Sequence, residues 1–121
     1  MLVVEGLDDS LVPNHATDSL AWELGPIPHL GPVQRVVPFL TPVTGPVIGN
    51  VDAQTSAALF QYVPVGVPGI PPTPGCAALV PASAGEGHYC AQSAAESLHQ
   101  REIFFQSALT GVPRIIDPFS E

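Results

Sequence analysis

The sequence contains no lysine and only three arginines, Arg35, Arg101 and Arg114, against eleven acidic residues, so its formal net charge is −8. Nucleic-acid binding depends on clustered basic side chains that neutralise phosphates. Because the three arginines are scattered along the chain, we exclude nucleic acid as a partner. Anionic membrane surfaces are disfavoured for the same electrostatic reason.

Long apolar runs are also missing. No stretch approaches the roughly 20 apolar residues that cross a bilayer, and we predict no transmembrane segment. The N-terminus does not resemble a secretory signal, because Glu5 follows only three apolar residues and no basic region precedes it. With 45% hydrophobic residues, the 121-residue chain is nevertheless apolar enough for one domain with a modest core.

Proline and glycine, by contrast, are abundant, with fifteen and eleven copies. Six of the prolines fall between Pro64 and Pro81. Because proline lacks the amide donor and has a fixed φ, this stretch predicts neither a helix nor a central strand. We therefore expect residues 64–84 to form a long Pro-rich loop. Residues 26–50 predict an irregular connection with at most a short strand at Gln34–Val37.

Two segments have the periodicity of helices. The first is expected to follow Asn14 as its N-cap and to end at Gly25-Pro26. The second is expected to run from Ser93, which caps it, to Leu109. The residues expected to face the core share helical spacing: Ala16, Leu20, Ala21 and Leu24 in the first helix, and Ala94, Leu98, Ile103, Phe104, Phe105 and Leu109 in the second.

Two further segments, residues 2–5 and 56–63, are short and apolar and predict strands, the first ending at Gly6. The order strand, helix, strand, helix predicts an α/β fold with a parallel sheet. Parallel strands need neighbours on both sides and helices on both faces, so two strands form an incomplete sheet. Because the first strand also begins at residue 2, we expect residues 1–121 to be a fragment of a larger domain.

Two loops carry the residues that are suited to chemistry. Residues 6–13 read G-x-x-D-x-x-V-P, and a carboxylate just past a parallel strand lies where open α/β sheets place functional groups. Residues 85–89 read G-E-G-H-Y and place His88 in a loop with two glycines just before it, which leave an imidazole accessible. Taken singly, the first pattern also fits an acidic turn, and the second also fits a solvated histidine.

Together, the acid and the histidine follow the chain order nucleophile, acid, base of the α/β-hydrolases. The sequence resembles the C-terminal part of a bacterial esterase or lipase of that family. LVVEGLDD followed by VP resembles its last acid-bearing strand and turn, GHY at 87–89 its histidine loop, and residues 95–117 its final helix and tail. The resemblance implies that Asp9 is the triad acid, with Asp8 as the runner-up, and that His88 is the general base. It implies hydrolysis of a small ester or a lipid, with no cofactor.

The family's nucleophile motif, G-x-S-x-G, is absent. The nearest string, at 81–85, begins with proline and follows the acid, so Ser83 is interpreted as a loop serine. The serine and the oxyanion amides are then expected from an N-terminal portion of the hydrolase domain. Met1 would be an internal methionine, a misassigned start or the start of a split gene. The alternative function is a non-enzymatic binding module with PxxP-type recognition at Pro68–Pro74.

Cys76 and Cys90 flank the predicted histidine loop. They are either a disulfide that pins this loop or two free buried thiols, and we favour the disulfide. Because disulfides persist in oxidising compartments, the parent protein is expected to be secreted or part of the cell envelope. His88 and Cys90 offer too few ligands for a metal site. His15 and His99 are expected to be surface residues on helices.

Overall fold

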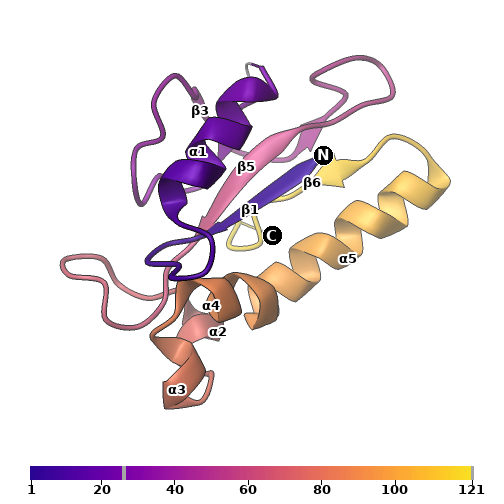
Figure 1. Cartoon of the computed structure of the whole chain (residues 1–121). Coiled ribbons are helices and arrows are strands. Elements are labelled where there is room, and N and C mark those ends of the chain that lie inside the picture. Colours follow the sequence, from indigo (N-terminus) through magenta and orange to yellow (C-terminus); the bar gives the residue numbers. More distant parts are fainter. Residues whose placement is uncertain (26, 121) are drawn as a thin grey trace.

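The computed structural model describes residues 1–25 and 27–120 as an α/β fold with a parallel sheet between helices (Figure 1). The strands are β1 (Leu2–Gly6), β2 (His29–Leu30), β3 (Pro42–Val43), β4 (Val47–Ile48), β5 (Ala58–Tyr62) and β6 (Arg114–Ile115). The helices are α1 (Asn14–Glu23), α2 (Pro74–Ala77), α3 (Pro81–Ala84), α4 (Gly87–Ser93) and α5 (Ala95–Thr110).

The main sheet has the strand order β1-β5-β2-β3, and its pairings are parallel. β1 and β5 pair along their full lengths, from Leu2 beside Ala58 to Gly6 beside Tyr62. These are the two strands that the sequence predicts. β4 and β6 form a separate antiparallel pair. The predicted α/β class with a parallel sheet is therefore confirmed, and the sheet has more strands than expected.

The segment 26–50 differs from the prediction. It contains β2, β3 and β4, whereas Gln34–Val37 forms no strand. The backbone amides of Gln34 and Arg35 instead donate to the side-chain oxygen of Gln61, at 3.1 and 2.9 Å. Pro42 opens β3, an edge strand, where the missing amide of a proline is tolerated.

α1 covers one face of the sheet (Figure 1). Its predicted buried face is partly confirmed: Ala21 is buried and Leu24 packs against the core, but Ala16 is exposed and Leu20 is 51% exposed. Asn14 is not the N-cap, because Pro13 occupies that position and makes no side-chain cap bond. The helix ends at Glu23, close to the predicted stop. Gly25 has a φ of +92°, and Pro26 lies outside the described residues.

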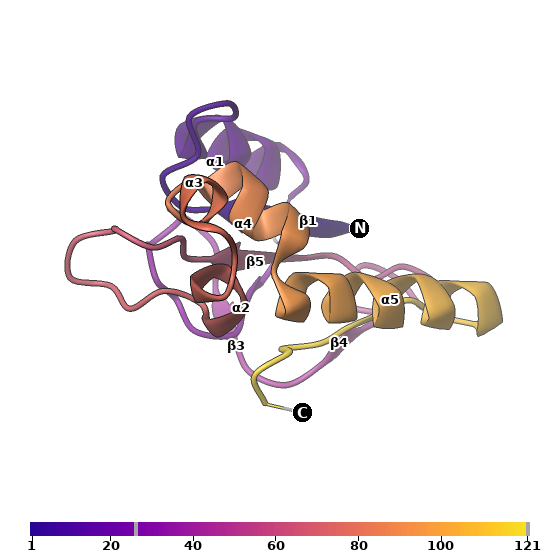
Figure 2. The same cartoon turned by 90° about the horizontal axis from the view of Figure 1, so that it is seen from below.

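The predicted Pro-rich loop at 64–84 is a loop only in its first half, which extends from the body of the molecule (Figure 2). α2 and α3 occupy most of the second half. Pro74 and Pro81 stand at the first helical positions, where the missing amide has no intrahelical acceptor to lose. Proline therefore does not exclude short helices here.

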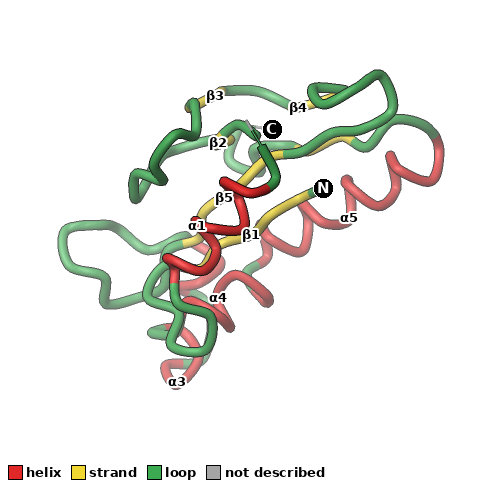
Figure 3. The backbone as a smooth tube through the Cα atoms, turned by 45° about the horizontal axis from the view of Figure 1, so that its top comes forward, coloured by secondary structure: helices red, strands yellow, loops and turns green. Residues whose placement is uncertain are grey.

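The predicted helix from Ser93 to Leu109 is confirmed as α5, which begins at Ala95, and a separate helix, α4, precedes it (Figure 3). Ala94 has the extended backbone angles φ −58° and ψ 139°, so Ser93 ends α4 and does not cap α5. α5 turns Ser97 and Gln100 inward. The apolar stripe faces outward: Leu98, Phe105 and Leu109 are 53%, 61% and 87% exposed, and Ile103 and Phe104 are half-buried.

The core consists of two apolar clusters on opposite faces of the sheet. Side chains alternate along β5, so that Phe60 and Tyr62 lie in one cluster and Leu59 lies in the other. The cluster beside α4 and α5 contains Leu30, Val47, Ala58, Phe60, Tyr62, Cys76, Cys90, Ala91, Ala94 and Ile115. The cluster beside α1 contains Val3, Ala21, Ile27, Val37, Ala57 and Leu59.

Candidate active site

A tight turn after β1 carries the two candidate acids. Asp8 has a φ of +56°, in the left-handed region that aspartate tolerates better than most residues. Asn14 holds this turn: its amide nitrogen donates to the carbonyl of Gly6 at 2.7 Å, and its oxygen accepts from the backbone amide of Asp8 at 3.2 Å. This bonding explains why Asn14 does not cap α1.

Asp9 faces the histidine. Its Oδ2 lies 3.1 Å from Nδ1 of His88, although 79 positions separate the two residues. Its Oδ1 accepts the backbone amides of Leu11 and Val12 at 2.8 and 2.7 Å. The structure therefore brings together Asp9 and His88, the two residues that the resemblance singled out. Asp8 is exposed and lines a different pocket, so the structure pairs the histidine with Asp9.

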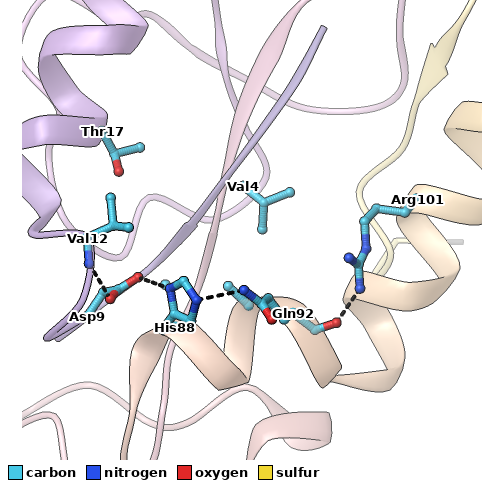
Figure 4. Close-up of a pocket in the computed structure, with 9 residues that line it drawn as sticks. Val4, Asp9, Val12, Thr17, His88, Gln92 and Arg101 are labelled. Atoms are coloured by element: carbon cyan, nitrogen blue, oxygen red, sulfur yellow. Dashed lines mark hydrogen bonds and ion pairs between the residues drawn. The ribbon is translucent and has the colours of Figure 1, made fainter.

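His88 lies in the first turn of α4, and not in a loop as the glycines suggested. This position puts Gln92 one turn along the same helix face. Nε2 of the Gln92 amide lies 2.7 Å from Nε2 of His88 (Figure 4). The amide donates to the ring, so Nδ1 carries the imidazole proton and donates it to Asp9. Gln92 thus occupies the ring nitrogen that a general base uses.

The flanking glycines allow two backbones to touch. A Cβ on Gly6 would overlap the carbonyl of Gly87, and a Cβ on Gly87 would overlap the carbonyl of Leu7. The backbone amide of Gly87 lies 3.4 Å from the carbonyl of Asp8. The sequence suggested that Gly87 gives freedom to a loop, whereas the structure uses it to bring α4 against the turn after β1.

The two cysteines are joined as a disulfide, as we favoured from the sequence. Cys76 and Cys90 have Cα atoms 5.0 Å apart, and both are fully buried. Because Cys90 lies in α4 and Cys76 in α2, the bridge ties the helix that carries His88 to its neighbour. The disulfide therefore restrains the position of α4, and with it the backbone of His88, relative to α2.

The pair opens into a pocket of ≈ 190 Å³ along β1 (Figure 4). In the described sheet, β1 pairs with β5 alone, so its other edge is open. Arg101 approaches from α5 and donates to the backbone carbonyl of Gln92. The lining residues come from β1, α1 and the helices α4 and α5: Val4, Gly6, Asp9, Val12, Thr17, His88, Ala91, Gln92 and Arg101.

Ser83 belongs to α3, and not to a loop as predicted. Its backbone amide donates to Val80 at 2.9 Å, and its carbonyl accepts from Glu86 at 3.3 Å. It does not line the pocket of His88. Within residues 1–25 and 27–120, the hydrogen-bond partner at Nε2 of His88 is Gln92, and not a hydroxyl. The arrangement therefore places the pair of Asp9 and His88 beside a pocket, with the Gln92 amide at the other ring nitrogen of His88.

Sequence reasoning missed Gln92, Glu86 and Arg101. Gln92 follows His88 by four positions, which would indicate a shared helix face had α4 been predicted to begin before the histidine. Glu86 precedes α4 and accepts the backbone amide of His88 at 3.3 Å. No local pattern marks Arg101, because its contact depends on the angle between α4 and α5.

A second group of polar side chains lies between the sheet and α1. Glu5 is 1% exposed and accepts from Arg35 at 2.6 Å and from Gln61 at 2.7 Å. Arg35 also pairs with Asp18. Burial raises the pKa of Glu5, and burial together with the charge of Arg35 lowers the pKa of His29. None of these side chains lines the His88 pocket, and we interpret the group as structural.

The remaining histidines and the comparisons with known proteins add no second site. His15 and His99 are exposed on helices, as expected. In the part of the chain that the structure describes, no helix is long and apolar enough to cross a membrane. In the same part, no three His, Cys, Asp or Glu side chains are grouped to hold a metal. No family model, no curated protein and no solved structure matches this chain.

Proposed function

We propose that the chain supplies the acid and the base of a serine carboxylic ester hydrolase, Asp9 and His88, while an N-terminal portion of the same domain supplies the nucleophilic serine. The supporting observation is the 3.1 Å contact between Oδ2 of Asp9 and Nδ1 of His88. Acid and base follow the two paired parallel strands in the chain order of the triad. They meet at the same end of the sheet.

The mechanism follows from the two ring nitrogens. The serine hydroxyl takes the place of the Gln92 amide at Nε2 of His88. His88 removes the hydroxyl proton as the serine oxygen attacks the ester carbonyl, and the resulting oxyanion is held by backbone amides of the N-terminal portion. His88 then returns the proton to the leaving alcohol. In the second half of the reaction, water attacks the acyl-enzyme in the same way, and the serine is released. Asp9 keeps the ring oriented and stabilises its positive charge.

The open edge of β1 supports this choice of partner. Leu2 and Val4 are half-buried, and Val4 lines the pocket beside His88. β1 contains no lysine or proline, the residues that usually protect an exposed sheet edge. A strand of the N-terminal portion that pairs with β1 would end beside His88. The Cys76–Cys90 disulfide supports a secreted or cell-envelope parent.

The test begins with the DNA upstream of the coding sequence. We expect it to encode, in frame or nearly so, a strand, a G-x-S-x-G turn and a helix. The joined polypeptide should hydrolyse short-chain p-nitrophenyl esters. Asp9→Asn should lower kcat by about 10⁴-fold, because it favours the wrong tautomer, and His88→Ala should lower it at least as much.

The isolated chain is the matched control. Without a positioned hydroxyl, it should give only background turnover and no labelling by a fluorophosphonate. Turnover of the isolated chain that disappears in His88→Ala would contradict the proposal, because the nucleophile would then lie in these residues. Ser83→Ala and Thr17→Val would identify it.

The second candidate function is an interaction module. It is favoured by the exposure of Pro68, Pro71 and Pro72 in the loop that extends from the molecule (Figure 2). Polyproline segments dock in aromatic grooves of other proteins. A stop codon and a promoter immediately upstream, with no serine-bearing segment, would favour this function over the hydrolase.

A further inference from the structure

The carboxylate of Glu86 joins the two segments that carry Asp9 and His88. Its Oε2 accepts the hydroxyl of Ser10 at 2.6 Å, and its Oε1 accepts the backbone amide of Ser10 at 2.8 Å. The same Oε1 accepts the backbone amide of His88 at 3.3 Å. Ser10 and Glu86 are 76 positions apart in the sequence, so their contact is purely tertiary. We call this contact the Ser10–Glu86 clasp.

Each residue of the clasp lies next to one member of the proposed catalytic pair in the sequence. Ser10 directly follows Asp9, and Glu86 stands two residues before His88. The other bonds of the Asp9 carboxylate, from Leu11 and Val12, lie within its own turn and do not restrain the distance to α4. The position of that turn against α4 therefore depends on contacts between the two segments.

The backbone hydrogen bond between these segments is weaker in geometry. The Gly87 amide reaches the carbonyl of Asp8 at 3.4 Å, near the limit for a hydrogen bond. The bonds to Glu86 are shorter and involve an ionised acceptor, which makes them the stronger restraint. The hydroxyl and amide of Ser10 lower the pKa of Glu86, so the carboxylate stays ionised into mildly acidic solution.

We propose that Glu86 is a positioning residue, which holds Asp9 within hydrogen-bond distance of His88 through the Ser10–Glu86 clasp. Its importance for catalysis rests on the proposed hydrolase function, while its effect on the Asp9–His88 contact does not. Glu86 itself touches neither the carboxylate of Asp9 nor the ring atoms in the described contacts. It acts through the backbone that carries them.

The test uses the full chain labelled with ¹⁵N and observed by NMR. The proton on Nδ1 of His88 should give a low-field signal that is lost in Asp9→Asn, and the ring nitrogens should report the Nδ1–H tautomer. In Glu86→Ala, we expect this proton to exchange with water about tenfold faster, because the bonds between the two segments are lost. Glu86→Gln keeps an acceptor for both backbone amides and a donor for the Ser10 hydroxyl oxygen, so it should restore slow exchange.

Glu102→Ala is the matched control, because Glu102 is an exposed carboxylate on α5 whose partner is Gln106 in the same helix. It should leave the His88 signal unchanged. Ser10→Ala removes only the hydroxyl and should accelerate exchange about threefold. If Glu86→Ala does not fold, the exchange rate in Ser10→Ala tests the proposal instead.

The outcomes separate the two proposals. A wild-type chain without an Asp9-dependent Nδ1 proton would overturn the catalytic pair itself, and with it the hydrolase function. A wild-type chain that shows this proton, with exchange unchanged in Glu86→Ala or in Ser10→Ala, would overturn the clasp alone. Faster exchange of the Nδ1 proton in both Glu86→Ala and Ser10→Ala, with slow exchange restored in Glu86→Gln, supports the clasp.

Discussion

At the scale of single residues, the site is held by polar contacts whose partners are far apart in the sequence. Asp9, His88 and Glu86 each have bonds that limit their movement, and the bonds converge on one turn and one helix N-terminus. A carboxylate with several donors favours its ionised form, so the contacts of Glu86 link the geometry of the site to pH.

The pH dependence of Glu86 follows from the direction of its shift. Its pKa in the folded chain is lowered from 4.5 by the Ser10 hydroxyl and amide, so its stabilising contribution is present above that value. This contribution is lost as the pH falls through the lowered pKa. Urea unfolding of the wild type and of Glu86→Gln should therefore differ most near neutral pH and converge as the pH falls through the lowered pKa of Glu86. A difference that grows on acidification would contradict this sign.

At the scale of elements, α5 buries only part of its expected face, because Phe104 packs against the core whereas Leu98, Phe105 and Leu109 are exposed. A helix with Leu98, Phe105 and Leu109 on one stripe is normally buried along that stripe. The structure instead buries Gln100, which accepts the hydroxyl of Tyr62 at 3.1 Å and donates to the carbonyl of Ile116 at 2.6 Å.

Two substitutions on α5 test this orientation. Gln100→Ala should destabilise the chain by about 2 kcal/mol, because it removes two buried hydrogen bonds, to the hydroxyl of Tyr62 and to the carbonyl of Ile116. Leu98→Ala should change the free energy of unfolding by less than about 0.5 kcal/mol, because Leu98 is largely exposed. Urea denaturation of the two variants measures both effects. The opposite ranking would show that the apolar stripe is the buried face.

At the scale of the whole molecule, a small sheet and many loops leave a modest core. In the main sheet, β1 and β5 pair along their full lengths, whereas β2 and β3 have only two residues each. A covalent link therefore contributes a large share of the stability that a chain of this size can reach. The Cys76–Cys90 bridge also joins α2 to α4, the helix that carries His88.

Removal of the disulfide should cost about 3 kcal/mol, because the unfolded chain regains the entropy of a closed loop. The double variant Cys76→Ala/Cys90→Ala should therefore melt well below the wild type in a calorimeter. Dithiothreitol should lower the melting temperature of the wild type and leave that of the double variant unchanged. A wild type that is insensitive to the reductant would contradict the bridge.

The sequence by itself determined the α/β class, the strands β1 and β5, and the candidates Asp9 and His88. It also favoured the disulfide. These features depend on local signals: β-branched apolar runs, turn residues after a strand, and the order of chemical groups along the chain. These signals can be recognised in the sequence because they do not depend on which residues come into contact in the folded chain.

Only the tertiary structure decided which aspartate meets His88, where α4 begins and which face of α5 is buried. The strands at His29–Leu30 and Pro42–Val43 were unpredictable for the same reason, because two residues carry no period and form strands only by pairing with neighbours. The contacts of Gln92, Glu86 and Arg101 depend on the angle and register between elements. Those quantities are set by packing across the whole molecule, and no local pattern encodes them.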